Sequence, residues 1–361
     1  MRSSRRWPVA ASRCRETIRF SLKHTKQSDR LKKLVESFDG VTVTVMGDLV
    51  ADEFVFGEIS RVSREAPVLI LKHLERQVVP GGGANAVFNL ADLGVTVLPV
   101  GVVGDDESGR ALLQALRRKR IATSGIVKLK GYTTPTKTRI LAGMAHSGRQ
   151  QVVRIDREPE EPPDEHTANF LLNATRQFLR TSEALLISDY GYGSATPQLF
   201  AAIRSSASGR PVTLDSRYRM LQYAGITAAT PNEPEVEEAL GIRIGHDARR
   251  LQAAGKRVLD LMKLDALVIT RGRDGMAVFQ RRRQAVAIPI HGSDQVTDVT
   301  GAGDTVIATF TAALAAGADA EDAARLANYA GGIVVMKRGT ATASRKELLA
   351  TLEQAAPHPH P

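Results

Sequence analysis

Gln295-Val-Thr-Asp-Val-Thr-Gly-Ala-Gly-Asp304 runs without a break into Thr305-Val-Ile-Ala-Thr-Phe-Thr-Ala-Ala-Leu-Ala-Ala316. The second half has high helix propensity and holds no Gly or Pro, so a helix is predicted to begin at or near Gly303. The first turn of a helix has backbone N–H groups without an intrahelical partner, and the helix dipole places partial positive charge there. We therefore expect a phosphoryl group to bind at this end of the helix, with amide donors from Gly301, Ala302 and Gly303.

Asp304 lies beside this predicted anion site, where a phosphate would repel a carboxylate. One explanation is structural: Gly-Ala-Gly makes a tight turn from strand to helix, and Asp304 caps the helix. The other is chemical: Asp304 accepts or orients the proton of an attacking hydroxyl. The helix N-terminus should hold the carboxylate ionised, which makes it a weak base, so orienting the hydroxyl would be the larger part of that role.

The seven residues Asp298-Val-Thr-Gly-Ala-Gly-Asp304 resemble the D-T-x-G-A-G-D signature of the ribokinase-like (PfkB) sugar kinases. This resemblance implies ATP and Mg²⁺ as cofactors, and it places Asp298 in the nucleotide site. It also implies that Asp304 is the catalytic base and that Gly301, Ala302 and Gly303 surround the phosphoryl group. Activation by a monovalent cation near Asp298 and Thr300 is left open.

The composition is that of a globular protein, with 361 residues, 43% of them hydrophobic and 24% charged. It has no apolar run of the ~18 residues that span a membrane. Because Cys14 is the only cysteine, no intrachain disulfide can form, and a cytoplasmic location is expected. The net charge of +10 comes almost entirely from residues 1–33, which hold eleven Lys or Arg against Glu16 and Asp29. The rest of the chain is nearly neutral, so neither a nucleic acid nor a membrane is expected as a partner.

Residues 1–30 are expected to be a basic extension, either disordered or upstream of the true start, because they lack the apolar core of a secretory signal. A targeting peptide and a phosphate-binding arm are the alternatives. One sugar kinase domain is predicted for residues 31–355.

The predicted fold class is α/β, a ribokinase-like, doubly wound and mostly parallel sheet flanked by helices, because strands and helices alternate along the chain. Among these elements we predict a helix at Glu233–Leu240, a strand at Ala266–Thr270 and a helix at Arg345–Gln354. Segments of about 53–72 and 132–156 hold strands that lie too close together for a crossover helix, with short strands predicted at 53–57 and 67–71 and a turn at 143–148. They predict a small antiparallel β flap that acts as a lid.

Pro80-Gly-Gly-Gly-Ala-Asn85 is the second glycine-rich stretch. Alone it predicts a turn, but beside the Asp298 signature it resembles the N-terminal sugar-binding motif of the same family. Gly81 and Gly82 would let the backbone approach a sugar, and Asn85 offers both donors and an acceptor. Asp48 follows the predicted first strand, where open parallel sheets bind ligands, and would grip a sugar hydroxyl.

The nucleotide side is indicated by Thr230-Pro-Asn-Glu-Pro-Glu235, which has the N-x-x-E spacing that the family uses near Mg²⁺ and the triphosphate. Asn232 and Glu235 are assigned to the cofactor, with Glu235 acting on the metal through water. A Glu in the first turn of a helix is otherwise a good match to the helix dipole. Thr270, Gly272 and Gly275 match the family's T-x-G-x-x-G nucleotide loop. Asn328 matches a position on the adenine side of the family's nucleotide pocket.

Three further stretches indicate which class of sugar is the substrate. Gly57–Val68, Ile187–Gly193 and Ala330–Thr340 resemble the heptose 7-phosphate kinases of lipopolysaccharide-precursor synthesis. This resemblance implies ATP-dependent phosphorylation of the C1 hydroxyl of D-glycero-β-D-manno-heptose 7-phosphate, which gives the 1,7-bisphosphate. Another PfkB kinase, acting on ribose, fructose 6-phosphate or a nucleoside, is the alternative, and a catalytically silent sugar-phosphate sensor is a second.

A phosphorylated substrate requires fixed cations, and Arg can hold a phosphate with two hydrogen bonds. We therefore assign a role in substrate binding to Arg61, Arg64, Arg139, Asp189 and Arg217, in addition to Asp48 and the Gly81–Asn85 stretch. Apolar side chains on the flap cannot all be buried within one chain, so a homodimer through the flap is expected. These side chains are Phe54, Phe56, Val68 and Ile70.

Overall fold

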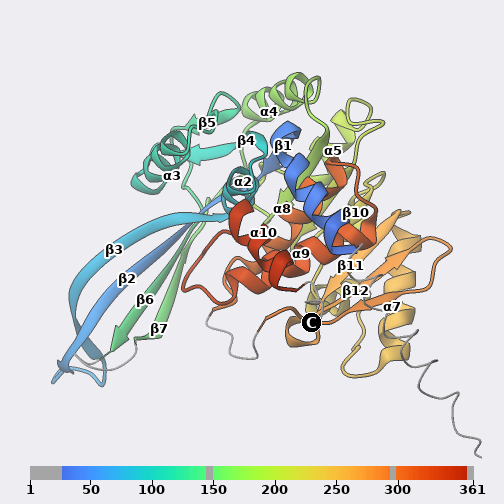
Figure 1. The fold of residues 1–361 in the computed structure, drawn as a ribbon. Coiled ribbons are helices and arrows are strands. Elements are labelled where there is room, and N and C mark those ends of the chain that lie inside the picture. The colour runs from blue at the N-terminus through green and yellow to red at the C-terminus, as the bar shows by residue number, and fades with distance from the viewer. Residues whose placement is uncertain (1–26, 144–148, 293–297, 356–361) are drawn as a thin grey trace, which may run out of the picture.

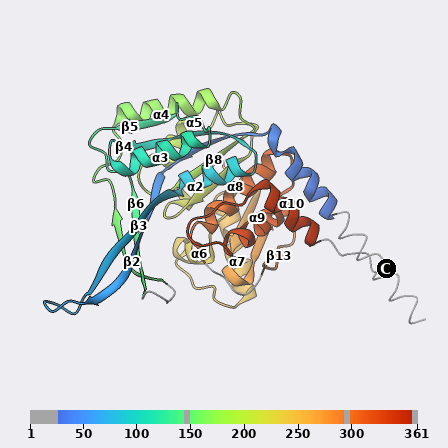
Figure 2. The same ribbon diagram turned by 60° about the vertical axis from the view of Figure 1, so that its left-hand side comes forward.

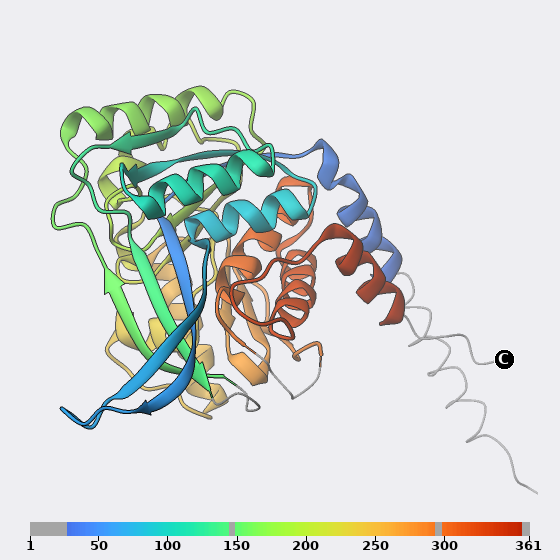
Figure 3. The same ribbon diagram turned by 90° about the vertical axis from the view of Figure 1, so that its left-hand side faces the viewer.

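The computed structural model describes residues 27–143, 149–292 and 298–355 (Figure 1). Most of the extension predicted for residues 1–30, most of the predicted turn at 143–148 and Gln295–Thr297 lie outside the described residues. Residues 27–36 are helical, so the body begins a few residues before the predicted boundary at residue 31. This first helix packs beside the last one, as Figure 3 shows, and the Ser28 hydroxyl donates to the carbonyl oxygen of Leu352 (3.0 Å).

The described residues form two sheets and a set of covering helices. The strands are β1 (Thr42–Gly47), β2 (Leu49–Val62), β3 (Leu69–Gly82), β4 (Thr96–Gly104), β5 (Ile126–Leu129), β6 (Thr136–Gly143), β7 (Gln150–Arg157), β8 (Ala184–Asp189), β9 (Val212–Ser216), β10 (Ala228–Ala229), β11 (Ala266–Thr270), β12 (Met276–Gln280) and β13 (Val286–Ile288). The named helices are α2 (Gly83–Asp92), α3 (Glu107–Arg118), α4 (Glu165–Phe178), α5 (Pro197–Ile203), α6 (Glu233–Leu240), α7 (Ala248–Leu261), α8 (Ala302–Ala315), α9 (Ala320–Val334) and α10 (Arg345–Gln354).

The larger sheet has nine strands in the order β13-β12-β11-β10-β9-β8-β1-β4-β5. Seven of them run parallel, and β12 and β13 pair antiparallel at one edge. This confirms the predicted doubly wound, mostly parallel sheet. The parallel strand β5 was not foreseen, because it has only four residues and Lys128 interrupts its apolar pattern.

Alternate side chains of the central strands enter two separate cores, because successive residues of a strand point to opposite faces. On β8, Ala184 and Leu186 pack under α2, α8 and α9, while Leu185 and Ile187 pack under α5, α6 and α7. Figure 2 shows helices on both sides of the sheet. Both faces of the parallel strands are therefore buried.

The helix α8 is buried along most of its length, from Asp304 to Ala313. The helix contains three threonines. The buried hydroxyls of Thr309 and Thr311 are hydrogen-bonded, because each donates to the carbonyl oxygen of the residue four positions earlier. The helix begins at Ala302, one residue before the predicted start. Its N-terminus lies at the end of the sheet where β9 and β11 terminate, because Gly303 and Asp304 line the same cavity as Asp215 and Thr270.

The four-stranded sheet, in the order β3-β2-β6-β7, projects from the body and is called the flap below (Figure 1). It consists of two antiparallel hairpins whose inner strands β2 and β6 run parallel. The strands β2 and β3 have 14 residues each, far more than the five-residue strands predicted at 53–57 and 67–71. The polar stretches 58–62 and 72–77 were read as connections, because the far end of the hairpin is exposed and lacks an apolar alternation.

Candidate active site

Two neighbouring cavities lie where α8 begins. The first, of about 480 Å³, is lined by polar residues from the ends of β9 and β11, from the start of α6 and from the turn before α8. The second, of about 180 Å³, is lined mostly by apolar residues of β12, α8 and α9. Both cavities are bounded by Thr270, Val299 and Gly303, so they adjoin. A polar chamber beside an apolar one suits a ligand that combines phosphates with a planar base.

The turn before α8 presents free backbone amides to the polar cavity. Gly301 is the N-cap residue with φ +77°, a left-handed conformation that glycine adopts without steric cost. The amide of Ala302 donates to the carbonyl oxygen of Val299 (3.2 Å), whereas those of Gly301, Gly303 and Asp304 have no protein acceptor among the described residues. The predicted anion site is therefore offered by Gly301, Gly303 and Asp304, and Ala302 is occupied within the turn.

Asp304 is buried, and both of its carboxylate oxygens accept hydrogen bonds. Asn85 Nδ2 donates to Oδ2 (2.9 Å), and the Tyr190 hydroxyl donates to Oδ1 (2.7 Å). Burial raises the pKa of Asp304 to about 7, although these two hydrogen bonds act to lower it. The expectation that the helix N-terminus would make Asp304 a weak base is therefore corrected, because desolvation outweighs it.

The Gly81–Asn85 stretch lies against Asp304, where β3 ends and α2 begins. Gly82 has φ +51°, and a Cβ on it would lie 2.8 Å from Val50 and 3.2 Å from the ring of Tyr190. Asn85 is buried and also donates weakly to the carbonyl oxygen of Gly301 (3.3 Å). The structure thus brings the two glycine-rich stretches together, and Asn85 contacts Asp304 itself.

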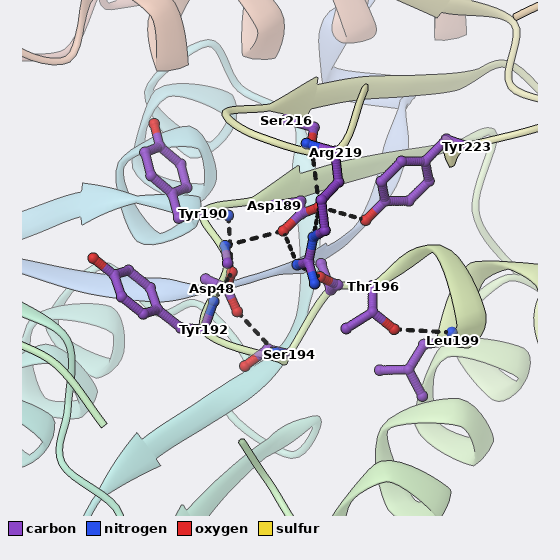
Figure 4. Close-up of polar contacts among 12 residues, drawn as sticks. Asp48, Asp189, Tyr190, Tyr192, Ser194, Thr196, Leu199, Ser216, Arg219 and Tyr223 are labelled. Atoms are coloured by element: carbon purple, nitrogen blue, oxygen red, sulfur yellow. Dashed lines mark hydrogen bonds and ion pairs between the residues drawn. The ribbon is translucent and has the colours of Figure 1, made fainter. Parts of the chain in front are cut away.

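Asp48 and Asp189 were both predicted to contact the substrate, and the structure gives them a different position (Figure 4). Asp48 accepts the backbone amides of Tyr190, Tyr192 and Ser194. Asp189 accepts hydrogen bonds from Ser216, Tyr223 and Arg219, and both carboxylates are about 1% exposed. Both carboxylates are buried and line neither cavity, so both assignments are corrected.

A further buried carboxylate beside the Gly81–Asn85 stretch is Asp52, which the sequence analysis did not single out. Its carboxylate accepts the Thr340 hydroxyl (2.9 Å) and pairs with Arg139, and a Cβ on Gly81 would lie 2.5 Å from it. Asp52 follows Asp48 by four residues on β2, within a buried segment. A carboxylate inside a buried strand was the signal that could have found it.

The predicted cations are spread over the fold. Arg217 lines the polar cavity, and Arg139 is held in its ion pair with Asp52. Arg61 ends β2 opposite Ile70, and Arg64 lies in the turn beyond it, both exposed at the far end of the flap. The assignment of Arg61 and Arg64 is therefore corrected for a single chain, since they line neither cavity.

Lys137 on β6 is a half-buried cation. Its ammonium lies 5.2 Å from the centroid of the Tyr190 ring. Burial lowers the pKa of Lys137, and the charge of Arg217 lowers it further, so two cations lie near one another beside Tyr190. No carboxylate lies within ion-pair distance of Lys137 among the described residues.

The N-x-x-E stretch forms a capping box at the start of α6, where Asn232 Oδ1 accepts the amide of Glu235 and Glu235 Oε2 accepts the amide of Asn232. Glu235 still lines the polar cavity opposite Asp215. Burial raises the pKa of both carboxyl groups, and the charge of Glu235 raises that of Asp215 further. Thr230 adds a buried hydroxyl without a partner at the same cavity.

These oxygen groups fit a hydrated Mg²⁺, which prefers oxygen ligands and keeps several of its waters. Glu235 and Asp215, which line the cavity, would hold the ion through water. No group of three or more metal-ligating side chains lies together in the described parts of the chain. Asp215 was missed in the sequence, because a carboxylate at the end of β9 becomes a metal candidate only when α6 places Glu235 opposite it.

Thr270, Gly272, Gly275 and Asn328 all line the apolar cavity, together with Met276 and Val306. Gly272 and Gly275 adopt φ +53° and +77° after β11. Asn328 donates from Nδ2 to the carbonyl oxygen of Pro289 (2.9 Å), which holds the loop after β13 against α9. The structure therefore groups these predicted nucleotide residues from two separate segments, the end of β11 with the loop after it and the helix α9.

Asp298 connects two loops rather than facing the apolar cavity. Its oxygens accept the amides of Thr300 (2.9 Å) and Gly339 (3.0 Å). Burial acts to raise the pKa of Asp298, but these hydrogen bonds and the charge of Arg139 outweigh it and hold the pKa below its ordinary value. Asp298 thus keeps the turn before α8 in place next to the segment after α9.

Comparison with known proteins agrees with this geometry. Solved structures of similar fold include the ribokinase of Arabidopsis thaliana complexed with ribose and ATP, with a TM-score of 0.67, 21% identity and coverage of 87% of this chain and 98% of that one. Another is the phosphofructokinase-2 of Escherichia coli in complex with substrates and products, with a TM-score of 0.70, 17% identity and coverage of 88% and 99%. At these identities the likeness establishes the fold. No helix in the ranges that the structure describes could cross a bilayer.

Sequence relatives include the bifunctional protein HldE of Trichlorobacter lovleyi, 39% identical over 328 residues that cover 89% of this chain and 65% of the relative. The bifunctional protein HldE of Geobacter sulfurreducens is 41% identical over 331 residues, covering 89% of this chain and 66% of the relative. The chain thus spans about two thirds of the length of these relatives. The model of the family described as "pfkB family carbohydrate kinase" matches residues 50–347, and the chain belongs to this family of kinases.

Proposed function

We propose that the protein transfers the γ-phosphoryl group of ATP to the C1 hydroxyl of D-glycero-β-D-manno-heptose 7-phosphate and so makes the 1,7-bisphosphate. The observation that carries the proposal is a buried carboxylate, Asp304, beside unoccupied amides at the start of α8 and at the edge of a polar cavity. The choice of heptose rests on the resemblance of Gly57–Val68 and Ile187–Gly193 to heptose 7-phosphate kinases. The relatives named HldE support the same assignment.

In the proposed reaction the C1 oxygen attacks the γ-phosphorus, and the bond from that phosphorus to the β,γ-bridging oxygen breaks as ADP leaves. Asp304 receives the proton of the C1 hydroxyl, and its pKa of about 7 suits a base that works near neutral pH. The amides of Gly303 and Asp304 donate to the oxygens of the transferring group. Mg²⁺, bound near Asp215 and Glu235, would supply positive charge for the phosphates.

The cations near the base suit an acceptor that already carries a phosphate. Arg217 and Lys137 approach from the body and from the flap, and their mutual repulsion in the free protein favours an anion between them. A sugar without a phosphate would leave this repulsion uncompensated. We therefore expect discrimination in favour of phosphorylated sugars.

A substrate panel tests the proposal. With ATP and Mg²⁺, we expect kcat/KM for the heptose 7-phosphate to exceed that for ribose and adenosine by about 10²-fold or more, as the loss of a charged contact predicts. Fructose 6-phosphate keeps a phosphate, so a lower kcat/KM for it would show that the sugar itself is recognised. Chelation of Mg²⁺ should abolish transfer, and replacing K⁺ by tetramethylammonium tests monovalent-cation activation. Preference for an unphosphorylated sugar would contradict the assignment of the substrate, and a protein that binds sugar phosphates without turnover would be a sensor.

We also infer a homodimer through the outer face of the flap. Val153 and Ile155 on β7 point to one face and are 44% and 50% exposed, whereas Phe54 and Phe56 line a cavity of about 440 Å³ on the other face. The two phenylalanines therefore lie on the face opposite the proposed interface. A second copy that covers the outer face would bury this apolar surface.

Sedimentation measures the dimer. The native chain should sediment as a dimer at micromolar concentration, and Ile155→Asp should shift it to monomer, since a charge would be buried in the interface. Leu261→Asp is a matched control, because Leu261 is 57% exposed on α7, far from the flap in sequence and fold. A native chain that is wholly monomeric at these concentrations would remove the proposal.

A further inference from the structure

The loop that follows β8, residues 190–194, is held by two buried carboxylates (Figure 4). Asp48 Oδ2 accepts the amides of Tyr190 (2.8 Å) and Tyr192 (3.0 Å), and its Oδ1 accepts the amide of Ser194 (2.8 Å). The loop can present alternate amides to one carboxylate because Gly191 and Gly193 adopt φ +91° and +97°. Three donors on one buried acceptor leave this backbone little freedom.

Asp189 fixes the same loop from its other side. It accepts the amide of Gly191 (3.0 Å), the hydroxyl of Tyr223 (2.9 Å) and the guanidinium of Arg219. Arg219 and Tyr223 follow β9, so the pairing also ties the loop to the neighbouring strand. The two carboxylates thus hold backbone in place, which raises the question of what the loop positions.

The side chain that the loop directs into the site is Tyr190. Its hydroxyl donates to Asp304 Oδ1 (2.7 Å), while Asn85 Nδ2 occupies Oδ2 (2.9 Å). Its ring is confined, because Gly82 packs against one edge and the ammonium of Lys137 lies 5.2 Å from the ring centroid. The hydroxyl therefore approaches Asp304 from a fixed direction.

We propose that Tyr190 is a positioning residue for phosphoryl transfer: its hydroxyl orients the Asp304 carboxylate, stabilises the ionised form, and so sets the lower pH limit of the reaction. This rests on the proposed role of Asp304 as the proton acceptor, but not on the identity of the sugar. Removing an O–H donor takes stabilisation from the ionised carboxylate only, so the pKa of Asp304 must rise in its absence.

The charged groups around Asp304 come from several elements. Lys137 on β6 lowers the pKa of Asp304, and Asp52 on β2 raises it. Asp215 after β9 and Glu235 on α6 face the same cavity with Arg217. All of these remain when the Tyr190 hydroxyl is removed, so a change in the pH profile reports the hydroxyl alone.

The test is Tyr190→Phe, which keeps the ring and its contact with Lys137 but removes the donor. With any sugar phosphate that the protein accepts, we expect the acidic limb of kcat/KM against pH to move up by about one unit, and activity at pH 6 to fall about tenfold. At pH 9 the variant should stay within about threefold of the native protein. Tyr192→Phe is the matched control, because the Tyr192 hydroxyl donates to the exposed Glu158 (3.0 Å), and its profile should not move.

A second measurement needs no substrate. Carboxyl carbon NMR of aspartate-labelled protein gives the titration midpoint of Asp304, assigned by the signal that Asp304→Asn lacks. The midpoint should rise in Tyr190→Phe, and it should rise less in Asp48→Asn, which loosens the loop without touching Asp304. An unchanged midpoint in Tyr190→Phe would overturn the inference, even if the heptose assignment were correct. A raised midpoint would support it, even if another sugar were the substrate.

Discussion

Asp304→Asn is expected to slow phosphoryl transfer by about 10²-fold or more while ATP and the sugar still bind. Asparagine keeps the shape of the side chain and loses its proton affinity. Its Oδ1 can accept from Asn85 and its Nδ2 can donate to the Tyr190 oxygen, so the local hydrogen bonds survive in altered form. The loss should therefore appear in kcat, with KM nearly unchanged.

The same variant should be more stable than the native protein above neutral pH. Burial raises the pKa of Asp304 from 3.8 to about 7, so the native fold binds a proton that the unfolded chain has released between these values. The stabilisation by the protonated form is complete below the unfolded pKa and is lost as the pH rises through 7. Asparagine avoids this loss, and we expect an advantage on the order of 2 kcal/mol at pH 8 that fades toward pH 4.

Turnover, ligand binding and chemical denaturation at pH 4 and pH 8 check both statements. Asp319→Asn is the matched control, because Asp319 is the N-cap of α9 and accepts the amide of Asp322, a role that asparagine can also fill. Its turnover and its pH dependence should match the native protein. A folded, binding-competent Asp304→Asn with near-normal turnover would remove Asp304 from the mechanism.

Gly301→Ala is expected to damage both stability and activity. The residue has φ +77°, and a Cβ there would lie 2.5 Å from Asn85 Nδ2. The strain and the clash should cost about 2 kcal/mol of unfolding free energy. Displacing Asn85 would also take away one of the two hydrogen bonds to Asp304, so kcat should fall by about 10²-fold.

Gly303→Ala distinguishes the backbone strain and clash expected in Gly301→Ala from the general effect of adding a methyl group at this turn. Gly303 lies in the first turn of α8, has no positive φ, and a Cβ on it would meet nothing within 4 Å. Its stability should equal or slightly exceed that of the native chain, by up to about 1 kcal/mol, because alanine favours a helix. Nucleotide binding should weaken, since the methyl group would enter the space beside the amides. Equal stability of the two alanine variants would contradict the role assigned to Gly301.

The arrangement of elements could be read from the sequence because it depends on local signals. The Ala-rich run after Asp304 predicted α8 within one residue, and the strand Ala266–Thr270 and the helices Glu233–Leu240 and Arg345–Gln354 were placed with the observed bounds. These bounds could be predicted because helix starts and strand ends carry their residue preferences in a few adjacent positions.

The chemistry of single carboxylates was decided by tertiary structure. Asp48 and Asp189 stand at strand ends, as a ligand-binding residue would, yet amides and donors from residues 190–194 and 216–223 occupy their oxygens. Asp52 carries no stronger sequence signal, yet it lies against Gly81 and pairs with Arg139. Asp304 was found from its signature, but only the fold shows that Asn85 and Tyr190 donate to its two oxygens. Whether an acceptor is free depends on which N–H and O–H groups other segments bring to it. Its pKa depends on how much water the whole fold removes, and neither quantity is encoded in the neighbouring residues.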